Sequence, residues 1–547
     1  MNVFRLIDRE LKINKRKFLS FAGISGFANA AILAVINVSA EHVSNKEDTI
    51  YYLALFIVVS AMYAVAQKQL MMEATTHVEK SINSLRIKLV KDILHSELST
   101  IETIGKEKIY TIVSKELQTM SQASALFVIC GQAAILLFFT ILYVAWLSPV
   151  AFFLTFIFLA IGSGWHILRS KEVKEKLKQA FDIENVLVTR LSDLLGGFKE
   201  VKLNSDRSSE LEKRILDLSD DVTETKISTQ KIYAVDFVIS QLTFFILTGA
   251  MVFLVPILSS VYPDVVMKVT TASLFLIGPI SNIVGGVPIF SNANAAIQNV
   301  LELEQMLQDG KSAFIPENPT DNFADGFNKI EMTGLYFSHS NGDDEKPFTV
   351  GPVNLVINRG ETIFITGGNG SGKTTFMRLM TTLYQASGGM IKVDGRIIDK
   401  NNCMAYRNLF SSVFADFHLF QEIYGISEED EAVYSEWLEY IGMSHKVKIR
   451  DKQFSTIKLS TGQRKRLALM VSALENRPIC IFDEWAADQD PTFREKFYSE
   501  ILPRLKANHQ TVIAVTHDDM YFDRADRQLK MVDGQIIEHH SHMESPL

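Results

Sequence analysis

Apolar residues form long runs over roughly the first 300 positions, and after that short apolar and polar stretches alternate. Six of the runs approach the ~20 residues that an α-helix needs to cross a bilayer. We therefore predict an all-α domain with six membrane-spanning helices, at about 18–38, 51–66, 122–147, 149–167, 237–258 and 269–290.

The first run has two interpretations. The basic segment Met1–Lys17 precedes it, and Val38-Ser39-Ala40 resembles a signal-peptidase site, as in a secretory signal. The run is too long for the apolar part of a signal, however, and further spans follow it. We interpret it as an uncleaved first transmembrane helix.

The connections between the spans alternate in length and charge. Three are short and poor in Lys and Arg, namely Glu41–Asp48, Ser148–Pro149 and Ser259–Met267. The N-terminus and the long connections Lys68–Ser121 and Arg169–Lys231 are basic. By the positive-inside rule, both termini and the long connections are expected in the cytoplasm.

Both long connections have a helical pattern. Thr76–His95 and Ser170–Leu218 carry apolar residues at helical spacing without internal proline. We expect helices that continue well below the membrane and turn near Gly105 and the pair Gly196-Gly197. A soluble helical insert is the alternative.

Polar residues inside the spans are costly if they face lipid, so they are expected to face the bundle interior. Candidates for a substrate cavity are Asn29, Gln132, Asp236, Gln241 and Asn282, and Asn37 is a further polar position. Simple hydrogen bonding between helices is the alternative for each. The segment Gly278–Pro288, with Gly285 and Gly286, predicts either a helix interruption or close packing.

The 547 residues are too many for one core, so two or more domains are expected. The net charge of −8 argues against nucleic-acid binding. Cys130, Cys403 and Cys480 show neither paired nor metal-ligand spacing, and we expect small buried side chains in a reducing compartment.

The second half has a different organisation. The transmembrane domain is expected over 1–310, and a polar, proline-containing linker follows over 311–327. From 328 to 547, short β-type runs alternate with helical ones, which is typical of an α/β domain with a mainly parallel sheet.

A phosphate-binding loop follows the apolar strand Thr362–Thr366. Gly367, Gly372, Lys373 and Thr374 fit the pattern G-x-x-x-x-G-K-[ST]. Glycines allow backbone N–H groups to surround a phosphate, the lysine adds charge, and the hydroxyl can bind Mg²⁺. The expected ATP contacts here are Gly367, Gly368, Asn369, Gly370, Ser371, Gly372, Lys373, Thr374 and Thr375.

Three further motifs follow the loop. Leu459–Gln463 precedes a helix, as at an anion site, although such strings are also ordinary helix caps. The strand Ile479–Phe482 ends in Asp483, expected to hold Mg²⁺ through water, and Glu484, expected to polarise the attacking water. A later strand, Thr511–Thr516, is followed by His517, which is expected to reach the γ-phosphate, although a single histidine is more often structural.

In this order and spacing, the motifs resemble the ATP-binding cassette (ABC) family: Walker A at Gly367–Thr374, the signature at Leu459–Gln463, Walker B at Ile479–Asp483, catalytic Glu484, the D-loop at Asp490 and the switch His517. With six preceding spans, the chain resembles an exporter-type half-transporter. The resemblance implies a homodimer in which ATP lies between Walker A of one cassette and Ser460, Thr461, Gly462 and Gln463 of the other.

A narrower likeness adds a substrate class. The strings Asp483–Pro491, Gly367–Gly370 and Thr516–Asp519 are similar to those of bacterial cyclic-peptide and siderophore-precursor exporters of the syringomycin, pyoverdine and microcin type. This implies peptide efflux across the bacterial inner membrane by alternating access, with no indication of an outer partner. The alternatives are a siderophore importer with an exporter fold, a non-transporting ABC ATPase and a lipid flippase.

The sequence departs from the family pattern at three places. His339 stands where an aromatic residue stacks on adenine, with Tyr336 as a substitute. Ala415 replaces the Q-loop glutamine, and Asp416 is a candidate metal ligand in its stead. Thr461 replaces a signature glycine. Because Glu484 is present, hydrolysis of ATP is expected.

Overall fold

The computed structural model describes residues 15–42, 49–259, 263–311, 323, 326–338, 348–426 and 431–539. They fall into two compact units. The first comprises residues 1–91 and 105–306, and the second comprises residues 92–104 and 307–547. The second unit therefore contains part of the first long cytoplasmic connection, which the sequence assigned to the transmembrane domain.

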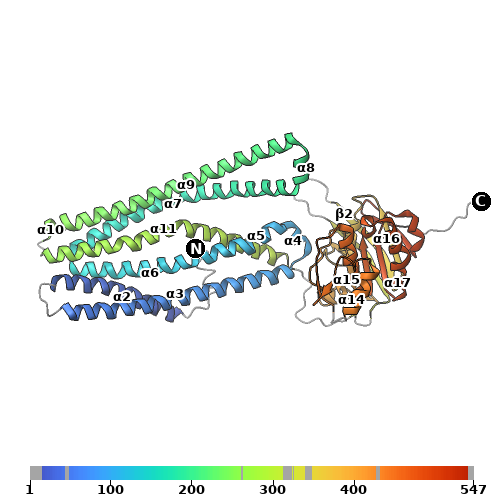
Figure 1. The fold of residues 1–547 in the computed structure, drawn as a ribbon, viewed down its shortest axis with the longest axis horizontal. Coiled ribbons are helices and arrows are strands. Elements are labelled where there is room, and N and C mark those ends of the chain that lie inside the picture. The colour runs from blue at the N-terminus through green and yellow to red at the C-terminus, as the bar shows by residue number, and fades with distance from the viewer. Residues whose placement is uncertain are drawn as a thin grey trace, which may run out of the picture. The chain divides into compact units, whose positions relative to one another are not determined.

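The first unit is helical (Figure 1). Its helices are α2 (Lys15–His42), α3 (Thr49–Leu94), α5 (Lys106–Thr111), α6 (Leu117–Leu147), α7 (Pro149–Gly196), α8 (Phe198–Leu203), α9 (Ser205–Phe253), α10 (Val255–Leu258) and α11 (Pro263–Asp309). A π-helical turn, Ile112–Glu116, joins α5 to α6. Five described stretches, within α2, α3, α5–α6, α9 and α11, have the length and hydropathy to cross a membrane, and the shorter apolar stretch Pro149–Trp165 opens α7.

The expected span 237–258 is not one helix, because α9 ends at Phe253 and α10 begins at Val255. Pro256 explains this break, since proline has no backbone N–H to continue the hydrogen-bond ladder.

The predicted long helices, which continue past the apolar spans, are found. The helices α3, α7 and α9 contain 46, 48 and 49 residues. At 1.5 Å per residue each is about 70 Å long, more than twice the hydrocarbon thickness of a bilayer. Both predicted turning points are also found. Gly105 has φ +86°, and α7 ends at Gly196 with Gly197 before α8.

The glycine-rich part of the last apolar helix favours close packing over interruption. Helix α11 continues through Pro279 and Pro288. A Cβ on Gly286 would lie 3.0 Å from Sγ of Cys130 on α6, so glycine permits the close approach of α6 and α11.

The second unit contains two main sheets (Figure 1). The six-stranded sheet has the order β12 (Gln535–His539), β11 (Arg527–Val532), β3 (Thr362–Gly367), β10 (Thr511–Val515), β9 (Ile479–Asp483) and β6 (Phe410–Val413), and it is parallel except for β12. The antiparallel sheet has the order β2 (Thr349–Asn358), β1 (Lys329–Ser338), β4 (Gly388–Val393) and β5 (Arg396–Ile397). A small hairpin pairs β7 (Ile449–Arg450) with β8 (Gln453–Phe454).

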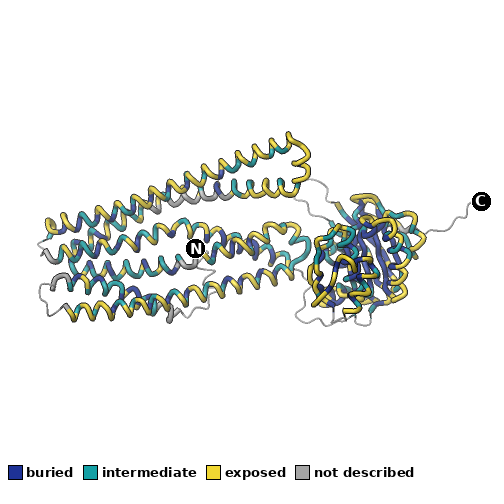
Figure 2. Tube along the Cα trace, in the orientation of Figure 1, coloured by how far each residue is buried: buried dark blue, intermediate teal, exposed yellow. Residues whose placement is uncertain are grey.

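Helices complete the second unit: α4 (Leu98–Ile104), α12 (Lys373–Met380), α13 (Cys403–Arg407), α14 (Glu431–Tyr440), α15 (Thr461–Leu474), α16 (Pro491–Lys496) and α17 (Leu502–Ala507). The central strands β9 and β10 are buried along their whole length, as Figure 2 shows for the interior of this unit. This burial on both faces explains their uninterrupted apolar sequences.

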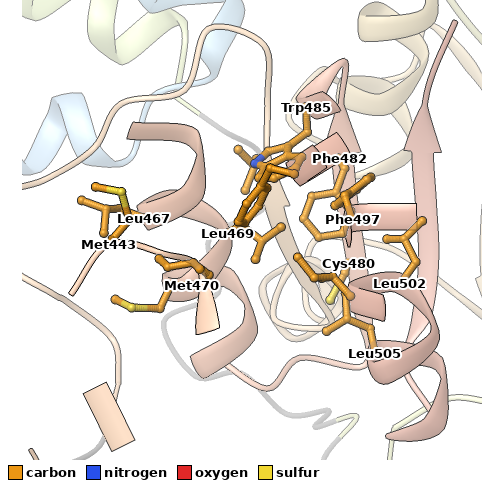
Figure 3. Packing of buried hydrophobic residues seen from close by; sticks show 14 of the residues in the cluster. Met443, Leu467, Leu469, Met470, Cys480, Phe482, Trp485, Phe497, Leu502 and Leu505 are labelled. Carbon is orange, nitrogen blue, oxygen red and sulfur yellow. The ribbon is translucent and has the colours of Figure 1, made fainter. Parts of the chain in front are cut away.

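The apolar core beside β9 includes Trp485, whose ring stacks on Phe497 at 4.5 Å between centroids (Figure 3). Cys480 belongs to the same core, and burial raises the pKa of its thiol to about 12. Cys403 is also buried, so the prediction of small buried cysteines is confirmed for these two.

Candidate active site

Three neighbouring parallel strands bring the predicted site residues to one edge of the sheet. Strand β10 lies between β3 and β9, with Val515 opposite both Ile365 and Asp483. The segments that follow these strands therefore lie side by side at the carboxyl ends, where ligands bind in open α/β sheets.

The phosphate loop follows β3. Its first glycine, Gly367, has φ +150°, and a Cβ there would lie 2.3 Å from the carbonyl oxygen of Met531 on β11. Gly372 has φ +98°, and its Cβ would lie 2.9 Å from Val350. Both positions require glycine, because a side chain there would strain the backbone at positive φ and would also collide with neighbouring atoms. The tip Gly368–Gly370 is exposed, as a phosphate cradle requires.

Lys373 begins α12, and its side chain is only 6% exposed. The ammonium donates to the carbonyl oxygens of Gly367 and Gly368, both at 3.0 Å, within its own loop. Nearby Ser371 has a buried Oγ with no hydrogen-bond partner among the residues that the structure describes. A polar atom buried in this way next to a lysine fits the oxygens of a phosphate.

Thr374 and Asp483 form the centre of the candidate metal site. The threonine hydroxyl donates to Oδ2 of Asp483 at 2.8 Å. Asp483 is 1% exposed, and its Oδ1 has no hydrogen-bond partner within the described part of the chain. Burial raises the pKa of this carboxyl, and the Thr374 hydroxyl opposes that shift. A hydroxyl and an incompletely satisfied carboxylate oxygen are suitable Mg²⁺ ligands.

Glu484 follows β9 in a left-handed conformation, with φ 49° and ψ 35°. Its carboxylate remains 38% exposed, in contrast to that of Asp483. Oε1 lies 3.8 Å from Nζ of Lys373 and 3.4 Å from Nε2 of His517. The structure therefore brings together the three side chains that the sequence predicted for the γ-phosphate side of the site.

The signature segment caps α15. The Ser460 hydroxyl accepts from the N–H of Gln463 at 3.4 Å, and the Gln463 side chain accepts from the N–H of Ser460 at 3.3 Å. Thr461 is exposed at the first helical position. The Thr461 side chain is therefore not buried in the protein core, and the N-terminus of α15 remains accessible to an anion.

Asp490, predicted at the D-loop, caps α16 by accepting from the N–H of Phe493 at 3.0 Å. That hydrogen bond and the neighbouring guanidinium of Arg466 lower the pKa of Asp490.

The Q-loop region differs from the expectation. Asp416, considered as a metal ligand, accepts instead from Arg378 on α12 at 2.9 Å. Arg378 also donates to Glu102 of α4 at 3.0 Å and to Tyr384 at 2.8 Å, and Tyr384 donates to Glu102 at 2.8 Å. No sequence motif identified Arg378, Tyr384 or Glu102. These three residues share no sequence motif, so their spacing along the chain does not identify them as a cluster.

The predicted adenine contact, His339, lies outside the described residues. Its possible substitute, Tyr336, is 38% exposed, and its ring packs against the backbone of Gly388.

Several polar side chains in the described helices of the first unit are paired. Ser25 on α2 donates to Gln67 on α3 at 2.8 Å, and Gln67 exchanges hydrogen bonds with Gln132 on α6. Gln67, which no sequence motif identified, thus joins three helices. Asp236 accepts from Trp165 at 3.2 Å and from Arg169 at 3.3 Å.

The other polar positions predicted inside the spans are Asn37, Asn29, Gln241 and Asn282. Asn37 donates to Tyr143 and to the carbonyl of Lys268, both at 3.3 Å. Asn29 and Gln241 are half-buried, and Asn282 is exposed. Gln132 and Asn37 therefore form hydrogen bonds between helices, which was the alternative to a role in a substrate cavity.

Comparisons with known proteins agree with this architecture. Residues 18–280 match the ABC transporter transmembrane region, and residues 350–487 match the ABC transporter family. The chain is 29% identical to the ATP-binding protein SyrD of Pseudomonas syringae pv. syringae, over 94% of this chain and 92% of SyrD. It is 31% identical to the probable syringafactin export ATP-binding/permease protein SyfD of Pseudomonas syringae pv. syringae (strain B728a), over 37% of this chain and 33% of SyfD.

A solved structure has the same fold. The structure of a bacterial Atm1-family ABC exporter with ATP bound gives a TM-score of 0.76 over 97% of this chain and 96% of that chain, at 14% identity. The matches cover both units, and the Walker A, Walker B and switch residues meet at one edge of the sheet. The chain therefore belongs to the ABC transporters of the exporter type, and it is an integral membrane protein whose cytoplasmic cassette binds and hydrolyses ATP to drive transport.

Proposed function

We propose that this chain exports a peptide from the cytoplasm across the bacterial inner membrane as a homodimer that works by alternating access. The peptide class is a cyclic peptide, a lasso peptide or a peptide siderophore precursor. The observation that carries this proposal is the similarity to SyrD over 94% of the chain, together with the export of syringafactin named for SyfD.

The geometry of the site supports a division of roles in hydrolysis. Glu484 is the general base, because its half-exposed carboxylate lies where a water can reach it, between Lys373 and His517. Lys373 and His517 stabilise charge on the γ-phosphate. Thr374 and Asp483 would hold Mg²⁺, which would supply positive charge to the phosphate oxygens.

The proposed dimer follows from the two kinds of phosphate-binding element in one cassette. Ser460 and Thr461 are exposed at the start of α15, and the tip of the phosphate loop is exposed as well. If each ATP lies between the phosphate loop of one copy and the signature of the other, two copies form two equivalent sites.

The Ser25–Gln67–Gln132 network, defined by the hydrogen bonds described above, is a suitable polar surface for a peptide. Each glutamine amide both donates and accepts hydrogen bonds, as peptide groups do. In apolar surroundings the hydrogen bonds between Gln67 and Gln132 stabilise the pair, and either amide can instead bind an amide group of the peptide substrate.

The proposal is tested with purified protein in inside-out vesicles. We expect ATP-dependent accumulation of at least one member of a panel of cyclic peptides, lasso peptides and siderophore precursors, and none with Glu484→Gln. Accumulation only in right-side-out vesicles would support an importer instead. Stimulated hydrolysis without movement of any probe would support a non-transporting ATPase. Movement of a fluorescent lipid alone would support a flippase.

A further inference from the structure

Lys465 is a buried cation that the proposed chemistry does not use. It lies on α15, five residues after Ser460, and its side chain is 3% exposed. Its Nζ donates to the backbone carbonyl oxygen of Glu484 at 2.8 Å and lies 2.8 Å from Oδ2 of Asp488. A buried ammonium needs such partners, because an unpaired charge in the interior is strongly unfavourable.

The carbonyl that Lys465 binds belongs to a strained residue. Glu484 has positive φ, a conformation that a non-glycine residue keeps only when its surroundings hold it. That conformation directs the Glu484 carboxylate toward Lys373 and His517. A cation fixed on the Glu484 carbonyl therefore acts on the orientation of the carboxylate without touching the nucleotide.

Other contacts join the same two segments. The indole N–H of Trp485 donates to the carbonyl of Lys465 at 2.9 Å, and Gln489 donates to the carbonyl of Gly462 at 3.0 Å. A Cβ on Gly462 would lie 2.5 Å from the carbonyl oxygen of Asp488, so this glycine permits direct backbone packing. Trp485 is also anchored in the apolar core (Figure 3). Together these contacts join residues 484–490 to the first turns of α15.

We propose that Lys465 is a positioning residue for Glu484: by binding the Glu484 carbonyl, it fixes the proposed catalytic carboxylate to the signature helix. This inference rests on the role of Glu484 proposed above. In the proposed dimer it has a consequence, because the signature of each cassette contacts the ATP of the other site. Nucleotide bound at one site then constrains the general base of the other.

The test uses the full-length protein in lipid and measures Mg²⁺-ATP hydrolysis and ATP binding separately. Lys465→Met keeps the length of the side chain and removes its charge and donors. We expect kcat to fall about tenfold or more while the Kd for ATP changes less than about twofold, since only the orientation of the base is affected. Lys465→Gln, which keeps an N–H donor, is expected to recover part of the rate.

The matched control is Lys496→Met on α16. Lys496 also donates to a backbone carbonyl, that of Tyr440, at 2.8 Å, but this carbonyl belongs to α14 and not to the site. We expect its kcat to stay within about twofold of wild type. An equal loss in the control, or a Lys465→Met rate within twofold of wild type, would overturn the proposal.

A double-mutant cycle separates positioning from general damage. If both residues act through one carboxylate, Glu484→Gln costs much less in the Lys465→Met background than in wild type. Full additivity would refute the proposal. If Lys465→Met does not fold, Asp488→Asn replaces it in the same cycle. The Asp488 side chain is 46% exposed, and this substitution removes only the counter-ion of Lys465. A wild-type rate for Glu484→Gln alone would instead refute the proposed role of Glu484.

Discussion

The hydroxyl of Thr374 donates to Oδ2 of Asp483 at 2.8 Å, although the two residues are 109 positions apart in the chain. This contact joins the start of α12, which follows the phosphate loop in sequence, to the end of β9. These two side chains would hold a cation beside the phosphate loop, where it would supply positive charge to the phosphates.

Asp483→Asn is expected to lower Mg²⁺-dependent hydrolysis by about 100-fold or more, because a neutral amide replaces the anionic metal ligand. ATP binding without Mg²⁺ is expected to change much less. The measurement is kcat over a Mg²⁺ titration, and a Mg²⁺ dependence identical to that of the wild type would contradict this role.

The pH dependence of stability provides a second test of Asp483. Burial raises the pKa of this carboxyl in the folded state, so the folded state retains the proton to higher pH than the unfolded state. Its contribution to stability is thus present at low pH and is lost as the pH rises through the raised pKa. Without Mg²⁺, we expect Asp483→Asn to have the higher melting temperature at pH 7.5, by several degrees, with a smaller difference near pH 4. A difference that does not depend on pH would contradict the assigned cause.

Glu484→Gln is expected to reduce turnover about 100-fold or more while ATP remains bound, because the amide cannot accept a proton from water. Glu495→Gln, on the exposed side of α16, is the control and is expected to leave turnover unchanged. Retained nucleotide is measured by filter binding after gel filtration, and the closed dimer is measured by crosslinking.

The cluster of Arg378, Glu102, Tyr384 and Asp416 leads to a prediction about coupling. The helix α4, which carries Glu102, connects in sequence to α3 and α5, and Arg378 follows Walker A on α12. We expect Glu102→Gln to leave basal hydrolysis within about threefold of wild type and to reduce vesicle transport about fivefold or more, because the charged contact with Arg378 is lost.

The matched control for that experiment is Glu107→Gln, which removes an exposed carboxylate on α5. The exchange Glu102→Arg with Arg378→Glu is expected to recover part of the transport. Equal losses of hydrolysis and transport in Glu102→Gln would show a general defect and not one of coupling.

For the pair Gln67 and Gln132 in the first unit, we predict that replacing both residues destabilises the protein less than replacing one. Gln132→Leu leaves the Gln67 amide without its partner on α6, which we expect to cost about 1–2 kcal/mol. The double variant Gln67→Leu with Gln132→Leu removes both amides and is expected to be more stable than either single variant. Thermal unfolding in lipid measures this, with Gln241→Leu as the control. A double variant less stable than both single variants would contradict the pairing.

The sequence by itself determined the elements and motifs of this protein. Apolar runs the length of a bilayer and the G-x-x-x-x-G-K-T pattern are local properties, because a helix, a strand or a glycine turn is specified by neighbouring residues. For the same reason the turning points at Gly105 and Gly196-Gly197 were predictable from glycine alone.

The tertiary structure decided which distant side chains meet. Sequence pattern placed Asp416 near the metal, whereas the fold pairs it with Arg378, because the two segments become neighbours only when β6 and α12 pack on the same sheet. Likewise, Gln67 meets Gln132 only because the helical bundle brings α3 and α6 together. The contact of Lys465 with Glu484 requires α15 to lie beside β9. Such contacts depend on packing between elements, which the spacing of residues along one chain does not encode.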